Sequence, residues 1–450
     1  MNNKKKELFE STPLNKAILI LSVPTVISSL VMVLYSLADT YFVGMINIKE
    51  ETAAVTIASV LLLAFNAVNN LFGVGGASLI SRSLGKKDYE TAHKASAFCF
   101  YLAIFSGILF SIFVSVFKGP LLNILGADAS TIESTSRYVF YTVSLGAVPA
   151  ILSVVMANLV RSEGCSLQSS IGSMTGCLLN IVLDPIFILI FDMKAAGAGL
   201  ATLISNCVAC IYFFIYIIRQ RKNTVLSFHI KDLRFEKDVT KEVFGVGLPA
   251  SVQNLLNVTS QGILNNKAAV YGAAAVAAIG IDHRVCLIPL MIIMGIGQGI
   301  MPLISYNYAS GNYERMKKAI YKTLFVSIFG ALLLTAFYFF GSDFIISLFI
   351  KDLETINHGS KLLKLHCLNL IFICIDFVSV GVFQATGKGK MSLFLAILRK
   401  IILEIPLLIV LDYIYPLYGM SLAQTLAEVG VAMVAIYFLS HLIKNCRYSI

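Results

Sequence analysis

The feature that most constrains this chain is a series of twelve long apolar segments separated by short polar loops. A helix needs about 20 mainly apolar residues to cross the hydrocarbon core of a bilayer. A membrane barrel would instead show alternating segments of about ten residues. The pattern therefore predicts an all-α polytopic membrane protein with twelve transmembrane helices. The segments cover residues 16–43, 53–75, 95–117, 138–160, 168–191, 197–218, 244–266, 274–298, 318–340, 361–383, 392–411 and 417–440.

Composition excludes the main soluble classes for a chain of 450 residues. Hydrophobic residues make up 57% and charged residues 13%, against about 25% charged in an ordinary globular domain. So few charged side chains cannot cover the surface of a soluble enzyme or of a nucleic-acid-binding domain. The net charge of +10 therefore indicates basic membrane loops rather than a nucleic-acid partner.

The distribution of Lys and Arg predicts the orientation, because cytoplasmic loops carry the basic excess. With the N-terminus inside, the inside loops include Lys86, Lys87 and the basic linker Arg219–Glu242, while the outside loops hold fewer basic residues. We therefore expect both termini in the cytoplasm. The linker is interpreted as a solvated cytoplasmic connection.

The linker lies near the midpoint of a repeated sequence. At an offset near 224 residues the second half repeats residues of the first, and a shift to 220 aligns Asp184 with Glu404. A repeat of six spans keeps both halves in the same orientation, related by an axis along the membrane normal. We predict two pseudo-symmetric six-helix lobes, 1–218 and 244–450, joined by the linker 219–243. Two such lobes around a central cleft are typical of transporters. The matches at offset 224 include Gly73 with Gly297, Gly75 with Gly299, Leu79 with Leu303 and Asp128 with Asp352.

Ionisable residues inside spans are expensive and indicate function by default. Asp39 lies late in the first span and Asp184 well inside the fifth, one helical turn after Asn180, so Asn180 and Asp184 share a helix face. With the hydroxyl of Thr202, these groups form a site of hard oxygen ligands suited to Na⁺ or a proton. Two structural alternatives stay open. Asp39 could be a helix-end residue, and Asp184 could make a helix–helix hydrogen bond.

The second half carries further charged residues within spans. Asp282 and Arg284 point in different directions from the eighth span, so Arg284 is expected to meet a carboxylate from another helix. Lys400 and Glu404 are one turn apart and are predicted to pair within their own helix. The glycine-rich segments GVGGASLISRSLG and GIGQGIMPLISYNYASG lack the lysine placement of a phosphate loop. They predict close helix contact instead.

These motifs resemble the multidrug and toxic compound extrusion (MATE) family of cation-coupled antiporters, in its prokaryotic Gram-positive-type subgroup. The resemblance runs through nearly the whole chain and implies two six-helix lobes in a V, with Asp39, Asn180, Asp184 and Thr202 at the family's N-lobe cation positions. One branch of the family has an acidic residue about eight positions after the proline of the seventh span, where this chain has Asn257. That departure favours the N-lobe site. The segments that carry the resemblance are PTVISSL, ADTYFVG, GGASLISRSLGKKDYETA, RSEG, NIVLDPIFI, GLPASVQN, GQGIMPLISYNYASGNYERMKKA and YGMSLAQTLAE.

Further candidate residues lie outside the cation site, and no family role is assigned to them. Asp376 lies near the family's acidic position in the tenth span, and we group it with Asn257, Asp282 and Arg284 as a C-lobe polar network. Three residues are assigned to the substrate cleft, where adaptable side chains suit varied ligands. They are Met32, Tyr35 and Met174.

The predicted function is efflux of amphipathic and cationic organic compounds by antiport with H⁺ or Na⁺. A flippase for a lipid-linked precursor or polysaccharide, from a related superfamily branch, is the alternative. An enzyme is not expected because no HExxH-like catalytic set occurs. We expect no cofactor, and no metal other than a possible Na⁺ at the N-lobe site. The protein is expected to function as a monomer in the cytoplasmic membrane of a prokaryote, with small organic molecules and the lipid bilayer as its partners and no nucleic acid.

Overall fold

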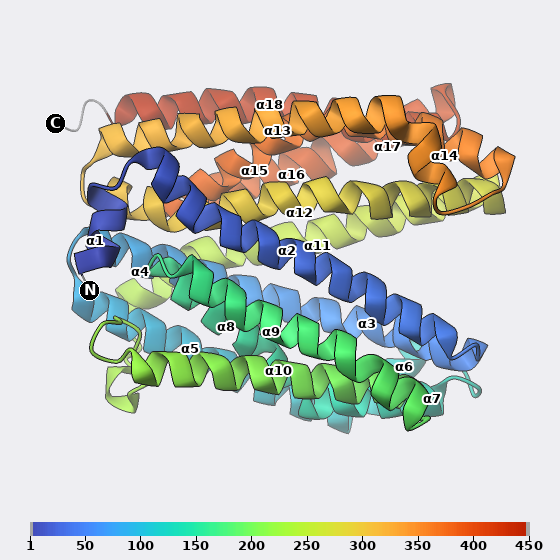
Figure 1. Ribbon diagram of the computed structural model, residues 1–450, viewed down its shortest axis with the longest axis horizontal. Helices are drawn as coiled ribbons and strands as arrows, with labels where there is room; N and C mark the ends of the chain where they lie inside the picture. Colours follow the sequence, from blue (N-terminus) through green and yellow to red (C-terminus); the bar gives the residue numbers. More distant parts are fainter. Residues whose placement is uncertain (1–2, 447–450) are drawn as a thin grey trace.

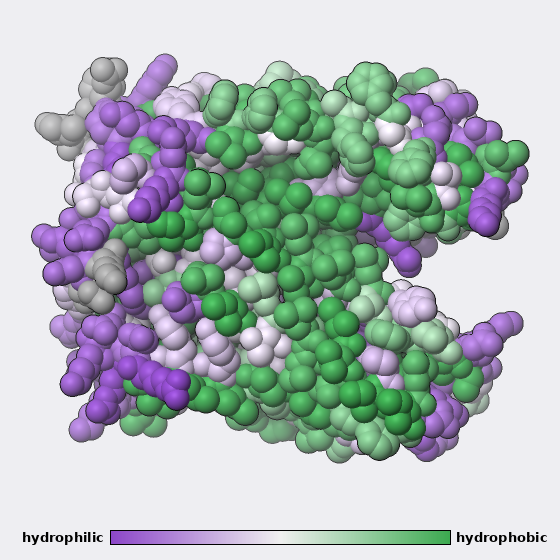
Figure 2. Space-filling model, viewed as in Figure 1, coloured by the Kyte–Doolittle hydropathy of each residue, from purple (hydrophilic) through white to green (hydrophobic). Residues whose placement is uncertain are grey.

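The computed structural model describes residues 3–446, and within that range every regular element is a helix. Two groups of helices form lobes that meet at one end and diverge at the other, which gives the molecule the outline of a V (Figure 1). Both ends of the chain lie where the lobes meet. The surface has an apolar belt between two polar ends, and it is hollowed between the lobes at the diverging end (Figure 2).

The N-terminal lobe follows a short helix α1 (Asn3–Glu10). Its spans are often interrupted by π-helical turns rather than running as single helices. The lobe comprises α2 (Leu14–Met45), α3 (Lys49–Asn69), η1 (Asn70–Val74), α4 (Gly75–Gly85), α5 (Tyr89–Val116), α6 (Lys118–Ile124), α7 (Ile132–Val139), η2 (Phe140–Leu145), α8 (Ala147–Ser162), α9 (Ser166–Pro185), η3 (Ile186–Ile190) and α10 (Lys194–Arg219).

The C-terminal lobe follows the linker, which contains the 3₁₀ turn η4 (Ile230–Asp232). The described part of this lobe ends at residue 446. It comprises α11 (Lys237–Ala268), η5 (Ala269–Tyr271), α12 (Ala273–Ala309), α13 (Tyr313–Ser347), α14 (Leu353–His366), η6 (Cys367–Asn369), α15 (Leu370–Ala385), α16 (Gly389–Ile397), η7 (Leu398–Glu404), α17 (Ile405–Ile414) and α18 (Tyr418–Asn445).

The predicted membrane-spanning architecture is confirmed. Among the described residues, nine helices are long and apolar enough to cross a membrane, or ten when the bent pair Ile132–Leu145 and Ala147–Ser162 counts as one span. The two remaining predicted spans are the amide-rich α11 and the broken run α16–η7–α17, which carries five charged residues. Several helices are longer than the spans predicted for them. At 37 residues and about 1.5 Å per residue, α12 is far longer than a hydrocarbon core of about 30 Å.

Repeated glycines join the two lobes closely. A Cβ on Gly75 of α4 would lie 2.3 Å from the carbonyl oxygen of Val243 in α11, and a Cβ on Gly299 of α12 would lie 2.6 Å from Cα of Ser22 in α2. Gly75 and Gly299 are equivalent positions of the repeat. In each lobe this glycine admits the first helix of the other lobe, which confirms that the glycine-rich segments serve close helix contact.

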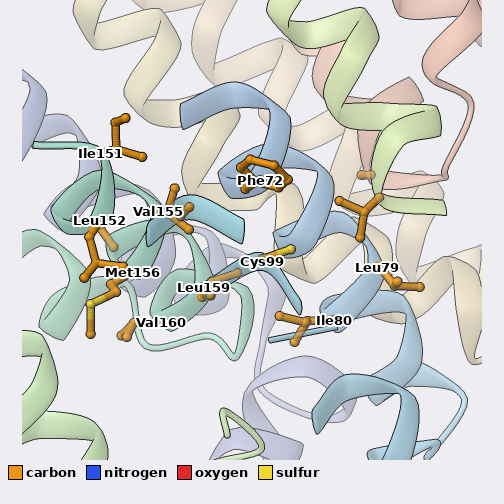
Figure 3. Packing of buried hydrophobic residues seen from close by; sticks show 14 of the residues in the cluster. Phe72, Leu79, Ile80, Cys99, Ile151, Leu152, Val155, Met156, Leu159 and Val160 are labelled. Atoms are coloured by element: carbon orange, nitrogen blue, oxygen red, sulfur yellow. The ribbon is translucent and has the colours of Figure 1, made fainter. Parts of the chain in front are cut away.

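The interior of the N-terminal lobe contains a large cluster of buried apolar side chains. Cys99 of α5 and Met156 of α8 are both fully buried, and Phe72 of η1 is 4% exposed. Figure 3 shows these side chains converging with those of α4 and α8. Such close-packed interiors move as units, so the lobe is a scaffold on which the polar residues of α2 and α9 are held.

A clasp formed by α1 closes the end at which the lobes meet. Phe9 is fully buried and stacks on Tyr306 of α12 with ring centroids 4.8 Å apart. On the other side, Lys5 Nζ donates to Glu163 Oε2 at the end of α8, 2.7 Å away. Burial, the largest influence, disfavours the Lys5 charge, but the nearby Glu163 and Cys165 together outweigh it and raise the pKa of Lys5. The α1 clasp therefore contacts both lobes.

The linker is less solvated than the sequence suggested. Residues 224–227 are buried, and the backbone N–H of Val225 donates to Glu163 Oε1 at 2.5 Å. The Thr224 hydroxyl donates to the same oxygen at 2.7 Å. The expectation of a solvated connection is wrong for this stretch, because its backbone satisfies a carboxylate that the α1 clasp also uses.

Candidate cation-coupling site

The N-lobe site is built on two adjacent helices, α9 and α10. Asp184 is fully buried and Asn180 is 1% exposed. With its amide nitrogen facing Asp184, Asn180 donates to Asp184 Oδ2 at 2.7 Å, and its amide oxygen lies 3.1 Å from the backbone N–H of Thr202. Thr202 Oγ1 donates to the carbonyl of Ala198 at 3.0 Å. Asn180, Asp184 and Thr202 therefore form one contiguous polar group.

The second carboxylate approaches from α2, which packs against α9. Asp39 is partly exposed and lies close enough to Asp184 for their negative charges to act on each other. Tyr35, one turn earlier on α2, is in electrostatic contact with Asp39, Asp184 and Thr202. Neither carboxylate has a basic side chain within ion-pair distance among the side chains that the structure describes. The four residues predicted for this site thus lie together, and Tyr35 joins them.

This arrangement is suited to holding a small cation. Two carboxylates in a poorly solvated region cannot both ionise cheaply, so one is neutralised by a proton or both share a cation. The amide oxygen of Asn180 and the hydroxyl of Thr202 are further hard oxygen donors. The residues present therefore fit either H⁺ or Na⁺.

The C-lobe residues predicted as one network fall into separate places. Arg399 of η7 donates to Asp376 Oδ2 at 3.0 Å and to Asn257 Oδ1 at 2.6 Å, and it lies 3.7 Å from Glu428. Asn257 and Asp376 are thus joined through an arginine. We call this group the Arg399 triangle, because Asn257, Asp376 and Glu428 surround Arg399. No spacing in the sequence indicated it, since the four residues come from four helices.

Asp282 and Arg284 lie outside that triangle. Asp282 pairs with His366 Nδ1 of α14 at 2.6 Å. Arg284 is exposed and has no carboxylate within ion-pair distance in the described part of the chain, so the expected partner for it is wrong. The predicted pair of Lys400 with Glu404 is confirmed, with Nζ and Oε2 2.5 Å apart.

A cavity of about 160 Å³ lies between the lobes, lined by residues of both. Arg161 is its one charged side chain among the described residues, and it donates to Asn158 at 3.0 Å and to Gln298 at 2.9 Å. Met294, Met301 and Phe377 supply apolar surface. None of the predicted cleft residues lines this cavity. Of the three predicted cleft residues, Met32 is 48% exposed, and Tyr35 and Met174 are partly exposed.

Comparison with known proteins assigns the fold to a family. The MatE family model matches residues 24–186 and 249–410. The chain belongs to the MATE family. The Multidrug export protein MepA of Staphylococcus haemolyticus (strain JCSC1435) is 33% identical over 440 residues, covering 97% of this chain and 96% of that protein. MepA of Staphylococcus aureus (strain MRSA252) is 32% identical over 436 residues, covering 97% and 95%.

Solved structures confirm the architecture. A structure described as the outward-facing conformation of a multidrug resistance MATE family transporter of the MOP superfamily has a TM-score of 0.93. It is 23% identical and covers 100% of this chain and 99% of that one. The fold is therefore the two-lobe fold of these structures, and membership of the MATE family makes the protein a membrane transporter rather than an enzyme.

The two matched segments also follow the repeat seen in the sequence. They begin at Pro24 of α2 and Pro249 of α11, the first helix of each lobe. Asp39, Asn180 and Asp184 fall inside the first matched segment, whereas Thr202 lies beyond it.

Proposed function

We propose that this MATE transporter exports amphipathic organic compounds, cationic ones among them, by antiport against H⁺ or Na⁺ bound at Asp39 and Asp184. The observation that carries the proposal is a pair of carboxylates that act on each other electrostatically and have no basic partner among the described side chains. Buried charges that serve only structure are normally paired. An unpaired site needs a mobile cation, and its relatives are named for multidrug export.

The first helix connects the site to both lobes. Helix α2 packs against α9 of its own lobe and against α12 of the other, and Thr25 Oγ1 donates to the carbonyl of Gly295 at 2.7 Å. Pro24 has no N–H to donate to the carbonyl of Ile20, which weakens the helix locally. Neutralising Asp39 would change how α2 is held against α9, and bending at Pro24 would alter the lobe interface.

Charge selectivity would come from the N-lobe site rather than from the cavity. The cavity contains Arg161 and no carboxylate among its described lining residues, so a cationic substrate would gain its attraction from Asp39 near the cleft. Cation binding there would remove that attraction and favour release. A flippase for a pyrophosphate-bearing lipid would need several basic residues where the cavity has one.

Orientation and assembly complete the proposal. Both ends of the chain lie at the closed end of the V (Figure 1), which we assign to the cytoplasm from the basic loops. All proposed site residues belong to one chain, so a monomer suffices and no cofactor beyond the coupling ion is required.

Cysteine labelling tests the orientation. A single cysteine at the exposed Lys222 should resist an impermeant reagent on intact cells and react in inverted vesicles. Labelling from outside would reverse the orientation.

Transport in proteoliposomes tests the coupling. Efflux of a fluorescent lipophilic cation should respond to an imposed H⁺ or Na⁺ gradient in the native protein and lose that response in Asp184→Asn. The matched control is Asp192→Asn, an exposed carboxylate of the same lobe, which should behave like the native protein. If Asp184→Asn pumps at the native rate with the same ion dependence, the proposed coupling site is wrong.

A further inference from the structure

A second polar cluster lies in the C-terminal lobe, apart from the cavity and from the Arg399 triangle. It contains Asp282 and His283 of α12 and His366, the last residue of α14. One ligand atom from each of the three lies within 4.8 Å of the other two. Asp282 and His366 are 3% and 8% exposed. Because 83 positions separate His283 from His366, no spacing in the sequence indicated that they meet.

The cluster leaves one nitrogen without a partner. His283 Nε2 is buried and has no hydrogen bond, although its ring packs edge to face against His366 with centroids 5.8 Å apart. A buried polar atom left unsatisfied costs about 1–3 kcal/mol. The imidazole therefore has a buried nitrogen that a ligand could satisfy.

A thiol extends the cluster by one helical turn. Cys286 Sγ lies 3.7 Å from Asp282 Oδ1, and Cys286 is buried. The Asp282 carboxylate has no ion pair with any Lys or Arg side chain that the structure describes. A divalent ion bound by one carboxylate, one thiolate and two neutral imidazoles would form a site without net charge, which suits a membrane interior.

We propose that Asp282, His283 and His366 form a binding site for a divalent transition metal, with Zn²⁺ as its representative and Cys286 adjacent as a fourth ligand. Imidazole and thiolate ligands with one carboxylate are those that Zn²⁺ prefers, whereas Mg²⁺ and Ca²⁺ take oxygen. The metal would replace the proton shared by Asp282 and His366. It would tie α12 to the junction of α14 with η6, where the tenth span is broken.

The site is independent of the proposed transport cycle. None of its residues lines the cavity, and the coupling carboxylates belong to the other lobe. The neighbouring charges at Lys400 and Glu404, which act on His283, neutralise each other in a contact of 2.5 Å. Metal binding would therefore stabilise the C-terminal lobe without carrying the coupling ion.

Cobalt spectroscopy tests the proposal directly. The purified full chain, stripped of metal and freed of any affinity tag, should bind one Co²⁺ with the visible absorption of a tetrahedral site. A thiolate-to-metal band in the near ultraviolet should report Cys286, and Cys286→Ser should lose that band but keep the visible one. A spectrum of hydrated octahedral Co²⁺ in the native protein would overturn the site without any variant.

Zinc affinity assigns the ligands. Equilibrium dialysis should give one tightly bound Zn²⁺ per chain, with affinity reduced in His283→Gln and His366→Asn by more than the roughly 10–100-fold that outer-shell partners cost. The matched control is His358→Gln. That histidine belongs to the same helix as His366 but bonds Tyr418 at 2.7 Å, so zinc affinity should not change. Equal affinity in all three variants and the native protein would refute the assignment.

Discussion

The two lobes place ionisable residues at equivalent positions but balance their charge differently. At an offset of 220, Asn180 and Asp184 of the N-terminal lobe correspond to Lys400 and Glu404 of the C-terminal lobe. Asp184 and Glu404 are both buried, and each contacts the residue one turn earlier. In the C-terminal lobe that residue is a lysine and supplies the positive charge. In the N-terminal lobe it is an amide, which supplies no positive charge, and we propose that a cation from solution supplies it.

The difference between the residues beside Asp184 and Glu404 indicates which carboxylate can bind a mobile cation. A carboxylate that is already paired with a lysine ammonium gains little free energy from binding a further cation. A carboxylate beside an amide and a second carboxylate gains much more. Asp376 and Glu428 also share the Arg399 guanidinium. The duplication thus produced two similar lobes that differ at these positions. The C-terminal lobe pairs Glu404 with a lysine, whereas Asp184 has no basic partner among the described side chains, and it is there that we propose a mobile cation binds.

The largest effect should come from making the N-terminal lobe resemble the other. In Asn180→Lys, an ammonium one turn before Asp184 should pair with it as Lys400 pairs with Glu404. The response of efflux to an imposed ion gradient should then fall by roughly 5–150-fold, the range of typical coupling energies. Gradient-driven transport in proteoliposomes measures this. Asn180→Met, which removes the amide without adding charge, should retain more of the response. If efflux by Asn180→Lys still responds fully to the ion gradient, the lack of a basic partner for Asp184 does not explain coupling.

The reverse exchange should cost stability. Lys400→Met leaves Glu404 buried with a hydrogen bond from Ser260 at 2.5 Å but without its ammonium. Breaking a buried ion pair from one side typically costs about 3–5 kcal/mol, so the melting temperature should fall clearly. The double variant Lys400→Met with Glu404→Gln removes both charges and should recover part of the loss. A melting temperature unchanged by Lys400→Met would show that the pair is not needed to neutralise Glu404.

The sequence predicted the architecture and most of the N-lobe site for physical reasons that do not hold in the C-lobe. Long apolar runs must be membrane helices, and Asn180 with Asp184 share a face because they are one turn apart on the same helix. Arg399 meets Asn257, and His366 meets Asp282, only because separate helices pack at particular rotations. Helical periodicity does not determine those rotations. The cavity was missed for the same reason, since its lining comes from both lobes.

An intermediate effect concerns the α1 clasp, which holds the unlike lobes together. Lys5 binds Glu163 of one lobe, while Arg315 Nε of the other donates to the carbonyl of Phe9 at 2.6 Å. Lys5→Met leaves Glu163, which is 1% exposed, without its counter-charge, at a cost of about 1–3 kcal/mol. Hydrogen exchange at the closed end of α12 should therefore accelerate.

Arg315→Met releases α1 from the other side and should accelerate exchange in the same region. The control is Arg137→Met, which removes an exposed pair with Glu133 and should change little, because such pairs contribute about 0–1 kcal/mol. If exchange in Lys5→Met and in Arg315→Met is as slow as in Arg137→Met, the contacts of α1 do not stabilise the end at which the lobes meet.

The smallest effect should appear at equivalent aspartates outside the spans. Four donors, the backbone N–H groups and hydroxyls of Ser130 and Thr131, contact Asp128 Oδ1 at 2.7–3.0 Å. Its counterpart Asp352 accepts two bonds from Thr355. The hydrogen bonds, with the Ser130 hydroxyl foremost, lower the pKa of Asp128 to about 2, and those from Thr355 lower the pKa of Asp352.

A folded-state pKa below the unfolded value of about 3.9 means that the stabilisation is complete above that value and is lost as the pH falls towards 2. Asp128→Asn cannot ionise, so it should flatten this part of the melting-temperature profile, and Asp352→Asn should flatten it less because fewer donors are involved. Melting curves between about pH 5 and pH 2, set against the native protein, measure both slopes. An equal slope in native protein and Asp128→Asn would show that the four donors do not favour the ionised carboxylate, and that the repeat preserves the position of this aspartate without its electrostatic role.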